Sequence, residues 1–367
     1  MAPIKSFAAP SKYFQGKDLL LHMGEYIGFL GDKFLVVTDN IVYGLTKDKL
    51  AQGFAAGDKK LAYEVEIFGG ESTAAEGERI GNIAREKGCC AVVGIGGGKV
   101  IDTSKYAANE SGLATVIIPT AAASDAPCSA MSVVYDENGA FVVSKKMKHN
   151  PDVVLVDTQV IAEAPVRLLL AGLGDAFATY YEARSAKASG VDNFTGGKRN
   201  EAGYAMAVLC NELLLKYGLA AKESVMKKEW SEAVDMITEA NIFLSGLGFE
   251  NNGCGISHAV YSGMTKVWDP FPVMHGEAVA FGVLVQLAAE YDNAGKVDER
   301  EWNEVKSFYQ SVGLPMSLKD LGIECDDEMM HKLAEAINTI ANAHKMPFEV
   351  DAALLYRALV KVNTCTI

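Results

Sequence analysis

The stretch Ala91–Lys105 (AVVGIGGGKVIDTSK) constrains the fold of this chain more than any other segment. A short apolar run typical of a strand leads into four glycines and then into a helical pattern. The glycines are Gly94, Gly96, Gly97 and Gly98. At the start of such a helix the first backbone N–H groups lack intrahelical partners, and the helix dipole favours an anion. Glycine lets the backbone approach a phosphate closely, and Lys99 adds a positive charge.

We therefore expect a phosphate-binding turn, although a strand-to-helix turn that needs glycine only for its dihedral angles would look the same. The stretch matches neither of the common nucleotide-binding patterns. Its glycine spacing differs from G-x-G-x-x-G, and Lys99 is not followed by Ser or Thr as in a P-loop.

Further β-rich runs alternate with helical segments on both sides of this stretch. They cover residues 34–39, 61–68, 114–118 and 153–157. Strands that alternate with helices predict a parallel sheet with right-handed crossovers. The turn-forming residues 136–139 (DENG) separate two short β-rich runs and predict a β-hairpin.

After about residue 161 the strand-like runs stop and long segments with helical periodicity take over. Within them, Gly246 and Gly248 are typical of a helix end. We therefore predict an α/β domain over residues 1–160 and an all-helical domain over residues 161–367.

Composition excludes several classes of function. The formal net charge of -13 disfavours non-specific binding to nucleic acid or to an anionic membrane. Seven scattered cysteines without a C-x-x-C pattern favour reduced thiols in a cytoplasmic enzyme over a disulfide framework. No signal-peptide pattern occurs in the first residues, and no apolar stretch reaches the roughly 20 residues that a membrane-spanning helix needs.

Asp39 follows the first predicted strand and has two equally good interpretations. Its carboxylate could accept hydrogen bonds from an adenosine ribose and repel the extra phosphate of NADP. It could equally be the N-cap of the following helix.

Three metal-capable side chains stand out in the helical half: Asp175, His258 and His275, each beside glycine in an apolar context. Two imidazoles and one carboxylate would leave an open coordination position, as catalytic metal sites do. Each histidine could instead be a hydrogen-bonded core residue. Cys254, four residues before His258, is a rival ligand.

Five segments together resemble one family. They are GIGGGKVIDTSK, PTAAASDAPCSAMSVVYDENG, LGDAFATYYEA, GISHAVYSG and MHGEAVAFG. Their order and spacing resemble those of the glycerol dehydrogenases, the zinc-dependent, NAD-linked branch of the iron-containing alcohol dehydrogenase superfamily. The resemblance runs from about Phe34 to Gln286 and covers most of the chain.

The resemblance implies a Rossmann-like dinucleotide-binding domain followed by a helical metal- and substrate-binding domain, as in dehydroquinate synthase. It implies Asp175, His258 and His275 as catalytic zinc ligands and Asp125 as a catalytic residue that contacts substrate. By itself Asp125 could equally be a turn residue. Thr179 stands where iron-dependent relatives usually add a histidine as a fourth ligand, which favours Zn²⁺. The resemblance also implies NAD-binding positions at Asp39, Gly96, Gly97, Gly98, Lys99, Asp102, Thr120, Ser129, Met131 and Tyr135.

The implied reaction is NAD-dependent oxidation of glycerol to dihydroxyacetone. A zinc-bound vicinal diol would lose a proton from one hydroxyl and transfer hydride to the nicotinamide. Three alternatives stay open at this point. They are a dehydroquinate synthase-like lyase, a dehydrogenase for another diol or hydroxyketone, and a nucleotide-sensing protein without turnover. Relatives form homo-octamers, so a homo-oligomer is also expected.

Overall fold

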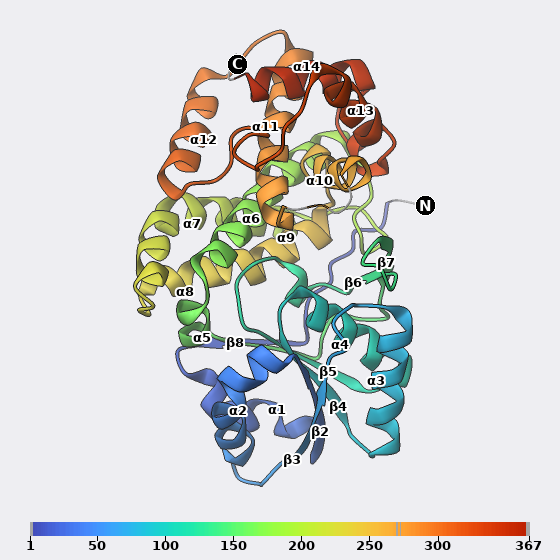
Figure 1. Ribbon diagram of the computed structural model, residues 1–367, viewed down its shortest axis with the longest axis vertical. Coiled ribbons are helices and arrows are strands. Elements are labelled where there is room, and N and C mark those ends of the chain that lie inside the picture. Colours follow the sequence, from blue (N-terminus) through green and yellow to red (C-terminus); the bar gives the residue numbers. More distant parts are fainter. Residues whose placement is uncertain (1–2, 269–270, 272, 365–367) are drawn as a thin grey trace. The chain divides into compact units, whose positions relative to one another are not determined.

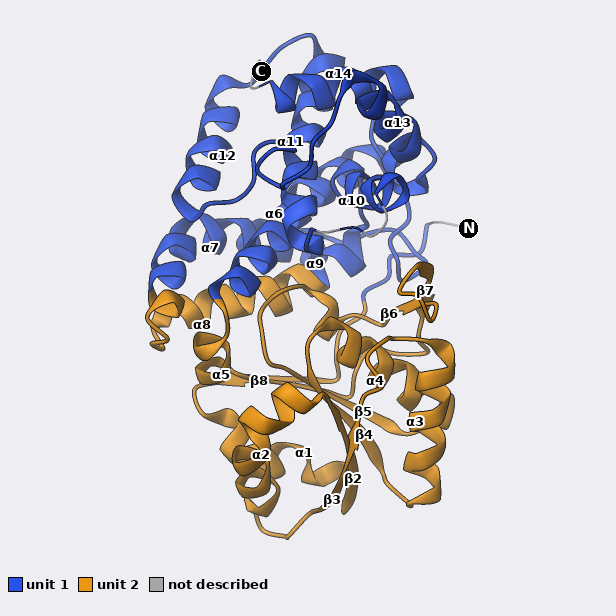
Figure 2. Ribbon diagram, in the orientation of Figure 1, with its two compact units in different colours: residues 1–7, 166–223, 247–367 blue, residues 8–165, 224–246 orange. Residues whose placement is uncertain are grey.

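The computed structural model describes residues 3–268, 271 and 273–364, which form two compact units (Figure 1). We call them the sheet unit, residues 8–165 and 224–246, and the helical unit, residues 1–7, 166–223 and 247–367 (Figure 2). The predicted domains differ from these units in three segments, residues 1–7, 161–165 and 224–246, and the domain boundary at residue 160 stays a prediction.

The sheet unit is built on six parallel strands in the order β1-β8-β5-β4-β2-β3. Their bounds are β1 Lys12–Gly16, β2 Lys33–Thr38, β3 Ala62–Ile67, β4 Ala91–Gly96, β5 Ala114–Pro119 and β8 Val153–Asp157. The parallel sheet predicted from the sequence is confirmed, with one strand more than expected. Strand β1 (KYFQG) lies at the sheet edge and lacks the continuous apolar run by which the other strands are recognised.

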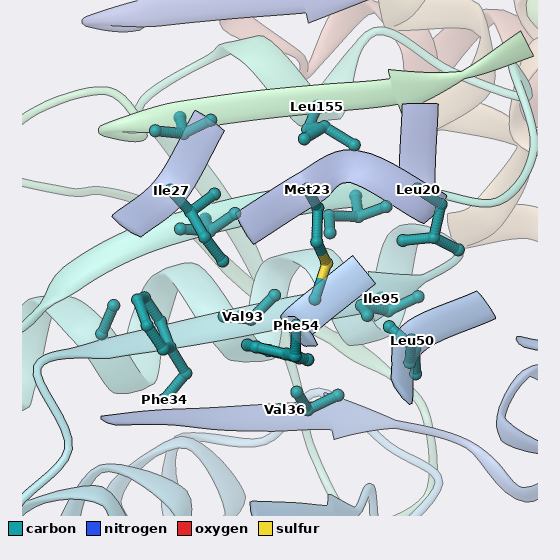
Figure 3. Close-up of a cluster of buried hydrophobic side chains, with 14 of the residues drawn as sticks. Leu20, Met23, Ile27, Phe34, Val36, Leu50, Phe54, Val93, Ile95 and Leu155 are labelled. Atoms are coloured by element: carbon teal, nitrogen blue, oxygen red, sulfur yellow. The ribbon is translucent and has the colours of Figure 1, made fainter. Parts of the chain in front are cut away.

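Both faces of the sheet are buried, as parallel sheets require. Side chains alternate along β2, so Phe34 and Val36 pack into one apolar cluster with Met23 and other residues (Figure 3). Leu35 and Val37 pack into a second cluster on the opposite face.

The helices of residues 8–165 lie between the strands of this unit, except for the last one, which follows β8. They are α1 Met23–Ile27, α2 Asn40–Ala55, α3 Ala74–Glu86, α4 Gly98–Ser111 and α5 Thr158–Glu163, with short 3-10 turns at Leu19–His22, Gly28–Leu30 and Ala126–Cys128. The predicted hairpin is confirmed as the antiparallel pair β6 Met131–Tyr135 and β7 Phe141–Lys146.

Residues 224–246 are helical in sequence pattern, but their side chains contact residues of the sheet unit. Trp230 donates from Nε1 to Thr158 Oγ1 at 2.9 Å, and Asn241 donates from Nδ2 to the Ala122 carbonyl at 3.0 Å. The ring of Phe243 packs on Tyr13, with centroids 4.5 Å apart. This segment contains α8 Glu232–Thr238 and a π-helical turn at Glu239–Leu244.

The helical unit contains long helices, in agreement with the sequence prediction. They are α6 Val166–Ser189, α7 Glu201–Met226, α9 Ser245–Asn252, α10 Ile256–Val267, α11 His275–Ala294, α12 Glu299–Val312, α13 Asp327–Asn338 and α14 Ala352–Asn363, with a 3-10 turn at Ala341–His344. The end of α7 and the start of α9 fall within residues 224–246 and so belong to the sheet unit.

Two expectations about glycine were wrong. Gly246 and Gly248 do not end a helix, because α9 runs through both of them. Gly248 is needed for packing instead, since a Cβ there would stand 2.4 Å from Thr179 Cγ2. Similarly, Gly94 and Gly96 belong to strand β4, not to the turn. A Cβ on Gly94 would stand 2.4 Å from Ser104 Oγ of α4, so glycine here lets α4 lie directly on the sheet.

Throughout residues 3–268, 271 and 273–364, every helix is too short or too polar to span a membrane. The cysteines within the same ranges form no disulfide.

Candidate active site

Three helices of the helical unit carry the predicted metal ligands. Asp175 lies within α6, His258 in the first turn of α10, and His275 is the first residue of α11. Glycines let these helices approach closely: a Cβ on Gly276 would stand 1.8 Å from the Ala171 carbonyl oxygen of α6. The glycines beside the ligands in the sequence therefore have a packing reason.

The three side chains converge on one point. Asp175 Oδ1 lies 3.2 Å from His275 Nε2 and 3.4 Å from His258 Nε2. Tetrahedral Zn²⁺ with bonds of about 2.0–2.2 Å separates neighbouring ligand atoms by about 3.3–3.6 Å. The residues present therefore fit a zinc-sized divalent cation, and their ligand atoms all lie within 4.8 Å of one another.

The electrostatics of the cluster follow from its burial. Burial alone would raise the pKa of Asp175, but the imidazoles of His275 and His258 outweigh it and hold that pKa below its ordinary value. Burial disfavours the charged form of His258, yet neighbouring Cys254 and Glu182 help raise its pKa well above the ordinary value. Asp175 and His258 thus stabilise each other's charge.

Glu182 contacts His258 from the side opposite Asp175. Its Oε2 lies 2.7 Å from His258 Nδ1, and its Oε1 accepts from the His258 backbone N–H at 2.9 Å. This residue was not among the predicted site residues. Its position seven residues after Asp175, two turns along the same helix face, was the only signal in the sequence. Cys254, the rival ligand, forms a second group with Glu182 and His258 whose ligand atoms lie within 4.8 Å.

The surroundings of His275 and Thr179 limit the site further. The ring of Tyr261 meets the His275 ring edge-on, with centroids 4.3 Å apart. Glu277 caps the start of α11 and pairs with Arg167 at 2.7 Å. Thr179 is 1% exposed, and its Cγ2 packs against Gly248 of α9.

In the sheet unit, the predicted phosphate-binding turn contains two glycines, Gly97 and Gly98, that the fold itself does not require. Gly97 is the N-cap of α4 with φ −88°, which any residue can adopt. A Cβ on either glycine would meet nothing within 4 Å. Neither backbone conformation nor protein packing therefore requires glycine here, and the space above the helix start is open to a ligand.

Lys99 and Asp102, on the first turns of α4, have different surroundings. Lys99 is half exposed and pairs with Glu71 at 2.6 Å, with its Nζ 5.6 Å from the centre of the Tyr135 ring. Asp102 is buried, which raises its pKa, and pairs with the equally buried Lys105 at 3.1 Å. Asp102 therefore faces the protein interior.

Asp39 is an N-cap, one of the two interpretations left open by the sequence. Its Oδ1 accepts from the backbone N–H groups of Ile41 and Val42 at 2.8 and 2.9 Å. Both of these hydrogen bonds use the same carboxylate oxygen, so capping and ribose binding are compatible.

The loop between β5 and β6 contains the remaining predicted residues. Asp125 is buried and accepts from Ser245 Oγ at 3.0 Å through Oδ2. Lys105 holds the loop from beneath by donating to the Ala126 carbonyl at 3.0 Å and to the Met131 carbonyl. Ser129 is buried, and Thr120 donates its backbone N–H to Gly96 at the end of β4. The structure thus groups these residues with the end of the strand that opens onto Gly97.

Comparisons with known proteins agree with this arrangement. The iron-containing alcohol dehydrogenase family matches residues 10–158. The chain is 41% identical to a glycerol dehydrogenase from Escherichia coli O6:H1, over 96% of this chain and 95% of that protein. It is 40% identical to one from Thermotoga maritima, over 95% and 94%. The crystal structure of glycerol dehydrogenase from Schizosaccharomyces pombe superposes with a TM-score of 0.91 at 32% identity, over 99% of this chain and 91% of that one.

A parallel-sheet unit with an open helix start and a helical unit with a carboxylate and two imidazoles define an oxidoreductase of the NAD-dependent, metal-containing class. The similarity over almost the whole length makes the assignment more specific. The chain belongs to the iron-containing alcohol dehydrogenase family.

Proposed function

We propose that this enzyme oxidises glycerol to dihydroxyacetone with NAD⁺ as the acceptor. The observation that carries the proposal is the convergence of Asp175 with His258 and His275 at ligand-to-ligand distances of 3.2 and 3.4 Å. The identity of about 40% to glycerol dehydrogenases over nearly the full chain supports the choice of substrate.

Zinc is the metal that we propose for this cluster. Three protein ligands leave one position open for substrate, the arrangement of catalytic zinc sites. When bound, the ion supplies Lewis acidity that lowers the pKa of a coordinated hydroxyl. Thr179 supports zinc over iron, because a threonine stands where iron-dependent relatives usually carry a histidine ligand.

The residues that we propose for cofactor binding lie in the sheet unit. We propose that the backbone N–H groups at Gly97 and Gly98 bind the pyrophosphate, with Lys99 adding positive charge. Asp39 would use its second oxygen for the adenosine ribose. Four residues would line the nicotinamide end: Thr120, Ser129, Met131 and Tyr135. Gly96 would support the turn as the last strand residue, and Asp102 would act indirectly through Lys105.

Asp125 is the proposed substrate-contacting residue. Ser245 donates to its Oδ2, which fixes the carboxylate in one orientation. A carboxylate held in this way can orient a diol through its hydroxyls or accept the released proton. The overall reaction balances as glycerol plus NAD⁺ giving dihydroxyacetone, NADH and one proton, with hydride leaving the secondary carbon.

The test combines a substrate panel with metal control. Glycerol, other vicinal diols and hydroxyketones are assayed with NAD⁺ or NADH on zinc-loaded and zinc-stripped enzyme. We expect NADH to accumulate with glycerol only when zinc is present, and His275→Ala to abolish that activity. A lyase that regenerates NAD within its cycle would accumulate no NADH. Turnover that is undiminished without metal, or undiminished in His275→Ala, would reject the proposal.

We also propose that the enzyme is a cytoplasmic homo-oligomer. An octamer is the stoichiometry to be tested first. Light scattering coupled to size-exclusion chromatography measures the mass directly, and a mass of one 39.3 kDa chain would contradict the proposal.

A further inference from the structure

Glu182 is a buried acid that the proposed mechanism does not use. Its side chain is 0% exposed and lies beside His258 in the helical unit. Burying a carboxylate is costly unless its oxygens are satisfied. Both oxygens of Glu182 have partners, and both partners belong to the same residue, His258.

One of these bonds completes the start of helix α10. The N-cap of α10 is Gly255, which has no side chain to accept from the first backbone N–H groups. Gln286 accepts from the Ser257 N–H at 3.3 Å, and Glu182 accepts from the His258 N–H at 2.9 Å. A carboxylate is also favoured by the dipole at a helix N-terminus.

The other bond determines which imidazole nitrogen carries the proton. A carboxylate 2.7 Å from Nδ1 accepts a hydrogen bond from Nδ1–H, so in the neutral ring the proton is on Nδ1 and the lone pair is on Nε2. Nε2 is the atom that faces Asp175 at 3.4 Å. The ring is therefore held between two carboxylates of α6, one on each side.

We infer that Glu182 is a positioning residue that orients the His258 ring and keeps Nε2 available as a metal ligand. The inference rests on the proposed function, because it requires His258 to be a ligand. Carboxylates that hold metal-bound histidines contribute about 10–100-fold to metal affinity or activity. Glu182 and Asp175 both lie on α6. This one helix therefore supplies a metal ligand, Asp175, and also orients a second ligand, His258.

The group formed by Glu182, Cys254 and His258 suggests a different use of the same atoms. A metal there would bind through Nδ1 and would take that nitrogen from Glu182. The backbone N–H of His258 uses Oε1 of Glu182, so the metal would need Oε2 and would break the 2.7 Å bond between Oε2 and Nδ1. The experiment below includes this alternative as an outcome that overturns the inference.

Glu182→Gln is the decisive variant. An amide has one oxygen, but two donors face this position, so one bond must be lost. The backbone N–H is always a donor, whereas the imidazole can move its proton to Nε2. The glutamine oxygen should therefore stay on the backbone, and the ring should present a protonated Nε2 that cannot bind metal.

We expect zinc affinity in Glu182→Gln to fall about 10–100-fold, measured by competition with a chelator on stripped protein. Bound Co²⁺ should show a visible absorption spectrum changed from that of the parent, because the ligand geometry changes. Glu290→Gln is the matched control: it neutralises another acid of this unit, which pairs with Arg184, and should keep the parent affinity.

The outcomes separate the inference from the function on which it rests. If His258→Ala binds zinc as tightly as the parent, the proposed ligand set itself is wrong. If His258→Ala loses zinc but Glu182→Gln keeps the parent affinity, the role of Glu182 is rejected. Loss of zinc in Cys254→Ala together with retention in Asp175→Asn would place the metal in the alternative group and also reject it.

Stability is followed in the zinc-free state of every variant. A purely structural cap would lose stability without a change in the Co²⁺ spectrum. If Glu182→Gln does not fold, Glu182→Asp takes its place, because it keeps the charge but is one methylene too short to reach both donors. Parent-like zinc affinity in Glu182→Asp would then overturn the inference.

Discussion

Gly174 lies directly against Gly276 where helices α6 and α11 meet: a Cβ on Gly174 would stand 2.3 Å from the Gly276 carbonyl oxygen. Each of these glycines is the chain neighbour of a proposed metal ligand, Asp175 or His275. The close approach of the two backbones is what allows a carboxylate and an imidazole on different helices to face each other at 3.2 Å.

Gly174→Ala should therefore force α6 and α11 apart. We expect a loss of about 1–3 kcal/mol in the free energy of unfolding and weaker zinc binding, because the added methyl group meets backbone. Denaturant unfolding and chelator competition measure the two effects. Gly44→Ala in α2 is the control, since nothing lies within 4 Å of its Cβ and alanine there should stabilise by up to about 1 kcal/mol. Equal effects of the two substitutions would contradict this account.

Gly98→Ala should leave the fold intact but weaken the binding of NAD⁺. Gly98 is the first residue of α4 and has open space around its Cβ position, so the fold should tolerate alanine or gain slightly from it. The methyl group would occupy the space that we assign to pyrophosphate. We expect the KM for NAD⁺ to rise at least about tenfold, equivalent to 1.4 kcal/mol, with no loss of thermal stability. A KM equal to that of the parent would show that phosphate binds elsewhere.

Asp39→Asn separates the two roles of Asp39, as the N-cap of α2 and as a determinant of the preference for NAD⁺ over NADP⁺. Asparagine is as good an N-cap as aspartate, so α2 should be retained while the negative charge is lost. We expect the preference in kcat/KM for NAD⁺ over NADP⁺ to narrow about tenfold, or 1.4 kcal/mol. Asp351→Asn, which changes the N-cap of α14, controls for a general effect on helix capping. An unchanged preference would leave Asp39 with its structural role alone.

Asp102→Asn tests the support of the loop between β5 and β6. The substitution leaves Lys105 buried with only carbonyl partners, and removal of one member of a buried pair costs about 3–5 kcal/mol. Urea unfolding should show this loss. The double variant Asp102→Asn/Lys105→Met should recover part of it, because no unpaired charge is left. If the double variant loses more free energy of unfolding than the two single variants together, Asp102 and Lys105 do not stabilise each other as a pair.

Several features could be predicted from the sequence because they depend on neighbouring residues. The β-branched runs, the turn at 136–139 and the glycines of 91–105 each encode local backbone preferences. The set of Asp175, His258 and His275 was recognisable because metal-capable side chains in apolar, glycine-rich contexts are uncommon. Strand β1 was missed because an edge strand buries little and needs no apolar run.

Other features depend on which segments meet, and no local pattern records that. The glycines at 94, 246 and 248 looked like turn or helix-end residues, but their reason is a neighbour far away in the chain, such as Thr179 against Gly248. Trp230 and Asn241 join the sheet unit through single long-range hydrogen bonds.

The sequence by itself determined the class of fold and the three side chains that we propose as metal ligands, because residue type and period act locally. Only the tertiary structure decided that Glu182 holds His258 and that Asp102 turns inward to Lys105. Those roles arise from distances between helices and strands, which are set by packing rather than by any single stretch of chain.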